Sequence, residues 1–495
     1  MTEKQRLAIR HPFRWLFEKE APGDEVPRKE LTSFTLGLMG QNQLYGMAGN
    51  WFFHFCTNVL GLGPLTVGRM TGAVTVFDAL NDPIAGALID KYRFKDGRKL
   101  LPWIKITSPF IAVLAFLLFV NWNLPGTGLT VLYCVSVYVT WDILYSFQDA
   151  ALWGMTAAIS NNSGQRARAT QWADIGTLLG GLLPGLLLSM LSGNGAFGLN
   201  QRQVYLLFAT FMCLGGGFLS MSALGMTERA REIEIVKDSI WRNIGVLRHN
   251  YILLLFLAFE LLKQCSPRIS DVYLYQQMTF QAFGKDIAAP VLVTVLVAVT
   301  GLPGTAMKFI ATKIADRVGG MKRIMLIAIF TEIVIRTLQY FIGIKTLPRF
   351  ILMYALQFFH ELPNSINNIA MRSMISDSVE YVEWKTGKRT EGITMSVRNL
   401  MSKMGGAINR YIQGLCLHFL QYSAVNVERG LPQNAHFHKW AWPVYRLGPV
   451  LGLLFALVPL LLLKYPDSLK QKVESEMAQR RAALDADAVK AAEPN

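Results

Sequence analysis

Apolar stretches about 20 residues long recur along the whole chain, and they constrain its fold more than any other feature. An α-helix of that length crosses the roughly 30 Å hydrocarbon core and satisfies its own backbone hydrogen bonds. Of the 495 residues, 52% are hydrophobic and only 17% are charged. The pattern predicts an all-α integral membrane protein. We expect about twelve spans, near 33–60, 66–90, 101–121, 127–158, 170–192, 203–226, 250–279, 288–312, 323–343, 350–377, 390–420 and 443–464.

Basic residues are concentrated in every second loop between these spans. The segment KYRFKDGRK (91–99) follows the second span, whereas the loops GLGP (61–64) and NWNLPGTG (121–128) hold no Lys or Arg. This alternation follows the positive-inside rule, and it predicts a multi-pass protein of the cell (inner or plasma) membrane with both termini in the cytoplasm. The net charge of +15 therefore reports topology, and we expect no nucleic-acid partner.

The longest polar connection, 227–249, divides the chain into two halves that share one signature. GALIDKYRFKDGRK (86–99) and ATKIADRVGGMKR (311–323) each place an Asp at a helix end, followed by Gly and basic residues. This repeat resembles the major facilitator superfamily, which implies 12 transmembrane helices in two six-helix bundles around a midplane site. The expected parts are an N-terminal segment (1–32), a bundle (33–226), the loop (227–249), a second bundle (250–465) and a tail (466–495).

The repeated loop also suggests a gate. Its residues either only cap helices and hold topology, or also control opening, and the two roles are compatible. The gating candidates here are Asp90, Arg93, Arg98, Asp316 and Arg317.

Two carboxylates in the second span point to a cation site. Asp78 and Asp82 are four residues apart, so they project from one helix face. Ionised groups at that depth usually face the protein interior or a wet cavity. Asp78 and Asp82 either have a structural role, paired with basic side chains, or form a site where the carboxylates share a proton or bind a cation. Asn81, and Ser146 in the fourth span, could add neutral oxygens of the kind that Na⁺ accepts.

The fourth span adds Asp149, with Asp142 seven residues earlier on roughly the same face. DALNDP (78–83), QDAALW (148–153) and the segment 377–407 together resemble the melibiose permease-like glycoside–pentoside–hexuronide:cation symporters. The resemblance implies that Asp78, Asp82 and Asp149 coordinate the cation, with Na⁺ as the candidate ion. It also implies that Asp149 and Trp153 contact the sugar. It implies that Lys403 links the second bundle to the acids, and no cofactor beyond the coupling ion. The implied cation-binding positions are Asp78, Asn81, Asp82, Ser146 and Asp149.

The substrate side departs from the family pattern. Asn42 stands where galactoside-binding members have an aspartate, which argues against a melibiose-like substrate. In the seventh span, Lys263 and Arg268 either point into the cavity and bind an anion such as a uronate or sulfonate, or pair internally with Glu260 and Asp271. In the ninth span Glu332 and Arg336 are i, i+4, and we expect them to pair.

A charged block follows the tenth span. It is either a solvated charge run or an ionic lock that closes the cytoplasmic gate opposite Arg93 and Arg98. Its gating candidates are Asp377, Glu383 and Arg389.

Secondary active symport of a sugar or glycoside with Na⁺ or H⁺ is the function these features favour, with an acidic sugar derivative as the preferred substrate. The alternatives are a carrier of an amphiphile such as a lysolipid, or an uncoupled facilitator. No catalytic motif argues for an enzyme. The five cysteines are scattered and form no ligand pattern with His, so no disulfide framework or metal centre is expected. We expect a monomer in the bilayer, with the sugar and a monovalent cation as partners.

Overall fold

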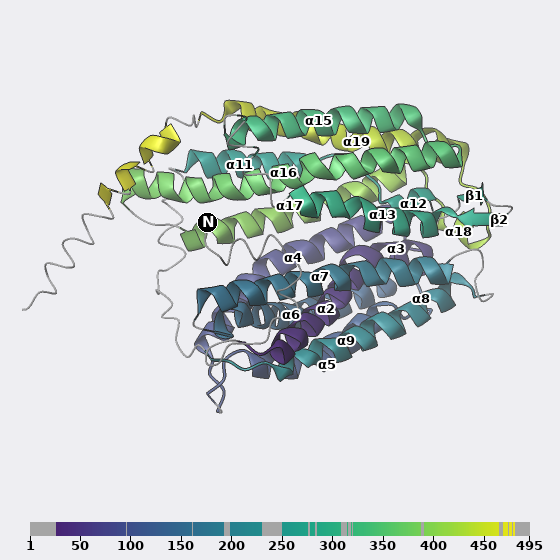
Figure 1. Cartoon of the computed structure of the whole chain (residues 1–495). Coiled ribbons are helices and arrows are strands. Elements are labelled where there is room, and N and C mark those ends of the chain that lie inside the picture. Colours follow the sequence, from purple (N-terminus) through teal and green to yellow (C-terminus); the bar gives the residue numbers. More distant parts are fainter. Residues whose placement is uncertain are drawn as a thin grey trace, which may run out of the picture.

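The computed structural model is almost entirely helical (Figure 1). It describes residues 26–95, 97–160, 162–192, 199–229, 250–275, 278–282, 285–307, 314, 318, 320–387, 391–464, 469–473, 475–477 and 479–480.

The first half of the chain forms one helical bundle. A capping box between Asn200 and Gln203 starts α8, and Pro64 occupies the first turn of α4, where its missing N–H costs no hydrogen bond. The elements are α2 (Arg28–Gly46), the π-helical η2 (Met47–Trp51), α3 (Phe52–Asn58), α4 (Pro64–Lys91), α5 (Leu101–Leu118), α6 (Thr127–Ala158), α7 (Ser163–Ser192), α8 (Gln201–Ala209), η4 (Thr210–Leu214), α9 (Gly215–Ser220) and η5 (Met221–Gly225).

The second half forms the other bundle, and the two lie against each other as layers (Figure 1). Gly387 ends the long α16 with a left-handed φ of 69°, which glycine adopts without strain. The elements are α11 (Tyr251–Gln264), α12 (Asp271–Tyr275), β1 (Thr279–Ala282), β2 (Lys285–Ala288), α13 (Ala289–Met307), α15 (Met321–Ile342), α16 (Leu347–Thr386), α17 (Glu391–Phe419), α18 (Ala424–Glu428) and α19 (Ala435–Leu462).

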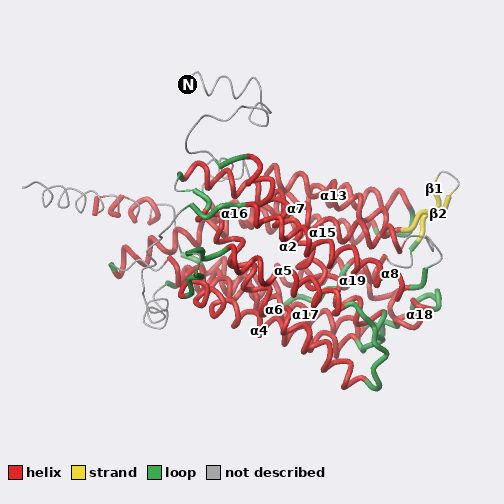
Figure 2. The backbone as a smooth tube through the Cα atoms, turned by 90° about the horizontal axis from the view of Figure 1, so that it is seen from below, coloured by secondary structure: helices red, strands yellow, loops and turns green. Residues whose placement is uncertain are grey.

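The two ends of the molecule differ. The antiparallel hairpin of β1 and β2 projects at one end (Figure 2), which we call the hairpin face. At the opposite end Arg229 pairs with Glu30, and Lys470 pairs with Asp377. We call this end the terminal face, because α2 begins there and α19 ends there.

Among the residues that the structure describes, the buried apolar clusters join the two halves only on the hairpin side. One cluster of buried side chains combines Phe52 and Phe119 of the first half with Tyr273 and Tyr422 of the second. Among the described residues, the cluster around Ile104 and Leu152 belongs to the first half alone. The cluster around Phe256 and Met374 belongs to the second half alone. The halves therefore pack tightly toward the hairpin face and separately toward the terminal face.

Helices α4 and α17 make the closest crossing between the halves. A Cβ atom added to Gly414 would lie 2.6 Å from the carbonyl oxygen of Pro64, and one added to Gly68 would lie 3.0 Å from the Cα of Gly414. Only glycine lets the two backbones approach this closely.

Large apolar side chains face outward around the bundle, as a lipid-facing surface requires. Phe218 and Phe341 are each 77% exposed. Among the described residues, five helical stretches are long and apolar enough to cross a bilayer by length and composition: Leu101–Leu118, Thr127–Ala158, Gln201–Gly225, Met321–Ile342 and Ala435–Leu462.

The remaining expected spans are also helical where described, although polar residues or breaks interrupt them. The seventh span is the one expectation that needs correction. The helix α11 ends at Gln264, just before Pro267, and the chain turns into α12 and the hairpin instead of continuing as one helix to residue 279.

Candidate functional site

A lysine from the second half lies between two carboxylates of the first. The ammonium Nζ of Lys403 on α17 lies 2.6 Å from Asp78 Oδ1 on α4, and it also contacts Asp82 Oδ2. The two acids are one helical turn apart and present the same face, as their spacing predicts. This contact brings together three of the residues that the sequence implicated, across the interface of the halves.

A serine hydroxyl and an asparagine amide N–H form hydrogen bonds beside the acid pair. The Ser146 hydroxyl on α6 donates to Asp82 Oδ1 at 2.8 Å, and it accepts from the Asn81 amide at 3.0 Å. Carboxylate, hydroxyl and amide oxygens are hard ligands that suit an alkali cation. The ammonium of Lys403 lies in contact with both carboxylates.

Asp149 is hydrogen-bonded to a different residue from the acid pair. Its Oδ1 accepts a hydrogen bond of 2.6 Å from Gln41 Nε2 on α2, and Gln41 also contacts the Tyr145 hydroxyl. Asn42 donates to Gln41 at 2.9 Å. Asn42 and Asp149, both predicted to meet the sugar, are thus joined through a glutamine that carried no signal in the sequence.

A small cavity of about 180 Å³ lies beside the acid pair. Its lining includes Asp78 and Asp142 of the first half, with Lys403 and Arg410 of the second. The guanidinium of Arg410 donates to the Tyr138 hydroxyl at 3.1 Å, which is a second polar link between the halves.

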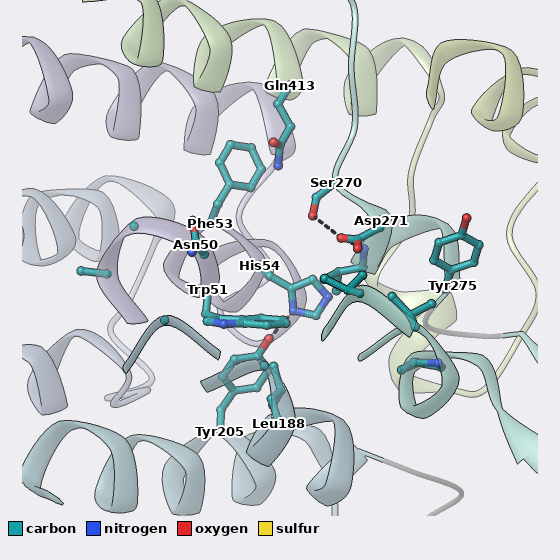
Figure 3. Close-up of a pocket in the computed structure, with 18 of the residues that line it drawn as sticks. Asn50, Trp51, Phe53, His54, Leu188, Tyr205, Ser270, Asp271, Tyr275 and Gln413 are labelled. Carbon is teal, nitrogen blue, oxygen red and sulfur yellow. Dashed lines mark hydrogen bonds between the residues drawn. The ribbon is translucent and has the colours of Figure 1, made fainter. Parts of the chain in front are cut away.

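A larger cavity of about 940 Å³ opens between the halves on the hairpin side (Figure 3). Trp51, His54 and Tyr205 line it from the first half, and Asp271 and Gln413 line it from the second (Figure 3). Its volume lies within the range of ligand sites, and the mixture of aromatic rings with amides and a carboxylate could bind a polyhydroxylated molecule. The two cavities share Gly49, Gly406 and Arg410 in their lining.

Several predicted substrate residues lie elsewhere. Among the described residues, neither cavity is lined by Trp153, which is 37% exposed, nor by Lys263 or Arg268. The internal pairs considered for the seventh span do not form. Arg268 donates to the Ser266 hydroxyl at 2.8 Å, and Asp271 accepts from the backbone of Val272. Arg268 lies in the loop after α11 and Asp271 begins α12, so no continuous helix aligns these two side chains.

The expected pair in the ninth span is confirmed. Arg336 lies 3.2 Å from Glu332, and the same carboxylate also contacts His360 at 3.3 Å. Since these side chains lie in the second half and line neither cavity, we assign them to the packing of that bundle.

Several gating candidates that the structure describes have contacts within their own half. Asp90 lies 2.5 Å from Lys99, and Asp377 lies 2.8 Å from Lys470. Arg93 donates to the Asp90 carbonyl at 3.4 Å, and the Glu383 carbonyl accepts from Gly387 at the end of α16. Arg98 is exposed at the same face. The candidates that lie outside the described residues are Asp316, Arg317 and Arg389.

A further ion pair fixes the terminal face of the first half. Arg229 lies 2.6 Å from Glu30, and these hydrogen bonds raise the pKa of the Arg229 guanidinium. The Glu228 carboxylate accepts from the backbone N–H groups of Lys99 and Leu100, just before α5, and of Leu101, its first residue. The loop after α4 is therefore tied to the end of the first bundle.

At the hairpin face, two hydrogen bonds join the halves. The Tyr422 hydroxyl donates to Asn58 Oδ1 at 2.8 Å, and the Tyr273 hydroxyl lies 3.0 Å from Thr57 Oγ1. The rings of Tyr273 and Tyr422 pack edge to face, with centroids 5.0 Å apart. We call these four residues the hairpin-face seal.

The comparisons with known proteins agree on one class. The model of the family described as MFS/sugar transport protein matches residues 33–467. The isoprimeverose transporter of Lactiplantibacillus pentosus is 24% identical over 468 residues, covering 93% of each chain. The lactose permease of Lactobacillus delbrueckii subsp. bulgaricus is 26% identical over 407 residues, covering 77% of this chain and 62% of that longer protein.

Among solved structures, a variant of the nucleoside transporter NupG matches with a TM-score of 0.60 at 12% identity. The match covers 88% of this chain and all of that one. At this identity the likeness concerns the fold alone, and it agrees with the two-bundle arrangement described above.

Proposed function

Because this chain belongs to the MFS/sugar transport protein family of membrane transporters, we propose that it carries a sugar or glycoside across the membrane together with a monovalent cation. The family match confirms the resemblance seen in the sequence and the major facilitator fold, and it separates the chain from the enzymes. The named relatives carry isoprimeverose and lactose, which supports a glycoside as substrate.

One observation carries the proposal of cation coupling: the ammonium of Lys403 in one half contacts both Asp78 and Asp82 of the other. A cation that binds between the two acids must displace the ammonium, so cation binding and the link between halves compete for the same oxygens. Binding at this site therefore changes how the halves are held together, which is what coupling requires.

We favour Na⁺ over H⁺ as the coupling ion. The Ser146 hydroxyl and the Asn81 amide lie in the same hydrogen-bonded group as Asp82. Neutral oxygens of this kind are needed to replace the hydration shell of an alkali ion, whereas a proton needs only a carboxylate. Asp149 is the third carboxylate that we assign to the ion.

For the sugar we propose the space between the halves, with the cavity of about 940 Å³ as one part of its path. An acidic sugar derivative is our preferred substrate, and its anionic group would meet Arg410, the arginine that lines both cavities. Lys263 and Arg268, which the sequence suggested for this role, line neither.

We place the chain in the cell membrane as a monomer with the terminal face in the cytoplasm. The basic segments 91–99 and 469–472 near that face support this orientation through the positive-inside rule.

The test is a charge-movement recording on purified protein in liposomes. Neutral glycosides, uronides and sulfonated sugars are applied in Na⁺ and in K⁺ buffer at fixed pH. We expect a current with one sugar class in Na⁺ only, and its loss in Asp78→Asn and Asp149→Asn. Asp174→Asn, an exposed acid of α7, is the matched control. No current in either buffer, together with uptake of labelled sugar into the same liposomes that is equal in both buffers, would identify an uncoupled facilitator instead.

A further inference from the structure

The charges around the acid pair do not balance. Four carboxylates lie in this region of the interface, against two bases, Lys403 and Arg410. The acids are Asp78, Asp82, Asp142 and Asp149. If one Na⁺ binds as proposed above, one formal negative charge is still left over within the membrane. Uncompensated charge at that depth is expensive, and an acidic substrate would increase the deficit.

Asp142 on α6 differs from the other three acids because it lacks a donor. Asp78 and Asp82 contact Lys403, and Asp149 accepts from Gln41. Asp142 is only 4% exposed, and its Oδ2 atom is sealed from the surface without a hydrogen-bond partner. No hydrogen bond or ion pair joins either of its oxygens to another described residue. An ionised carboxylate in that setting would be strongly disfavoured.

Asp142 is among the residues that line the cavity of about 180 Å³. The charged groups that share this lining are Asp78, Lys403 and Arg410, from α4 and α17. Oxygen atoms of uncharged side chains complete it: the hydroxyls of Tyr45, Thr75, Tyr138 and Ser402. A space of this size holds several waters or one partly hydrated ion. The lining therefore offers oxygen ligands around a buried acid that has no partner.

We propose that Asp142 binds a second monovalent cation, a proton or an alkali ion, separate from the one held by Asp78 and Asp82. The inference rests on the proposed cation coupling, which it extends from one positive charge per cycle to two. With both cations present, four acids meet four positive charges, and the loaded site is formally neutral before the sugar enters. With a neutral glycoside bound, the fully loaded carrier then crosses between states without excess charge in the membrane, whereas an acidic sugar adds one negative charge.

The experiment measures both ions on the purified full-length chain, with no sugar present. Infrared difference spectra with and without NaCl detect the C=O stretch of a protonated carboxylic acid, and equilibrium binding of radioactive Na⁺ gives the number of ions per chain. If Asp142 binds a proton, we expect a carboxylic acid band in the wild type. The band should be lost in Asp142→Asn and shifted in Asp142→Glu. If Asp142 binds an alkali ion, we expect two Na⁺ ions bound per wild-type chain and one bound per chain of Asp142→Asn.

Controls keep the test decisive. Asp174→Asn, an exposed acid of α7, should change neither measurement. If Asp142→Asn does not fold, the wild type and Asp142→Glu still show whether the band exists and moves. The proposal is overturned if no band depends on residue 142 and one Na⁺ binds per chain in both proteins. Absence of any Na⁺ binding would instead refute the proposed coupling ion, and the infrared band would still decide on Asp142.

Discussion

At the scale of single residues, Lys403 has the most demanding position in the molecule. It is 30% exposed, yet its ammonium contacts two acids of the opposite half. Its side chain reaches between them only because α17 packs along α4. Removing the ammonium would leave two carboxylates one helical turn apart with nothing between them, and like charges so close repel each other.

We expect Lys403→Gln to lower the melting temperature by about 2 °C in K⁺ buffer, and Na⁺ to restore it. The cation takes the place that the ammonium leaves, and a ligand that binds only the folded state stabilises it. Na⁺ affinity should rise by about tenfold, because binding no longer has to displace the lysine, which corresponds to roughly 1.4 kcal/mol. Thermal unfolding and Na⁺ titration measure both effects. Lys105→Gln, an exposed lysine of α5, is the control, and equal behaviour of the two variants would contradict the prediction.

Gln41 carries a second prediction at this scale. Its amide donates to Asp149 at 2.6 Å, and hydrogen bonds to charged groups contribute about 1.5–3 kcal/mol. Gln41→Leu should therefore weaken Na⁺-dependent uptake, raising the half-maximal Na⁺ concentration by about tenfold or more. Gln43→Leu changes the opposite side of the same helix and should leave that concentration unchanged. A shift in both variants would indicate a general packing effect on α2.

The sequence revealed the acids of the site better than their partners. Asp78 and Asp82 were detectable because a carboxylate within an apolar helix is costly and needs a reason. Gln41 was not, since a neutral amide among several polar residues of the first span gives no such signal. Arg410 was missed because its role depends on its contact with the opposite half. The residue pattern within one helix does not show which side chains of another helix it meets. The same holds for the unpartnered oxygen of Asp142.

At the scale of elements, the hairpin-face seal holds the ends of α3, α12 and α17 together. Each of its two hydrogen bonds contributes about 1 kcal/mol. We expect the double variant Tyr273→Phe and Tyr422→Phe to shift the balance toward a state open at the hairpin face by about 30-fold. The aromatic packing remains, so the fold should be retained.

Distances between two spin labels, measured by double electron–electron resonance, would detect that shift. The labels go on Pro125→Cys and Glu428→Cys, exposed positions of the two halves, with the exposed Cys265 replaced by Ser. A longer distance population should grow in the double variant. An unchanged distribution would show that the aromatic rings alone close this face.

The positions of the helices were predictable from the sequence, whereas the breaks between and within them were predictable only in part. The expected spans from 127–158 and 323–343 agree with α6 and α15 to within a few residues, because long apolar runs have one stable solution in a bilayer. The hairpin of β1 and β2 was missed. Its strands are four residues each, and they fall between two apolar runs that a hydropathy argument joins to the neighbouring helices.

At the scale of the whole molecule, the proposed coupling predicts reciprocity. If the sugar tightens Na⁺ binding by some factor, Na⁺ must tighten sugar binding by the same factor, about 5- to 150-fold for typical couplings. Titrating each ligand with and without the other, by calorimetry in detergent, gives both numbers. Unequal factors would mean that the two ligands do not share one binding cycle.

The glycine crossing of α4 and α17 has a geometric consequence for this cycle. With no side chains between them, the backbones at Gly68 and Gly414 can roll on each other with little resistance, so the crossing is suited to act as a pivot. Lys403 lies about 16 Å from Gly414 along α17. A rotation of about 10° around the pivot would move its ammonium by roughly 3 Å, more than the 2.6 Å hydrogen bond to Asp78 can follow. A small tilt of one helix is thus amplified into the making or breaking of a charge contact.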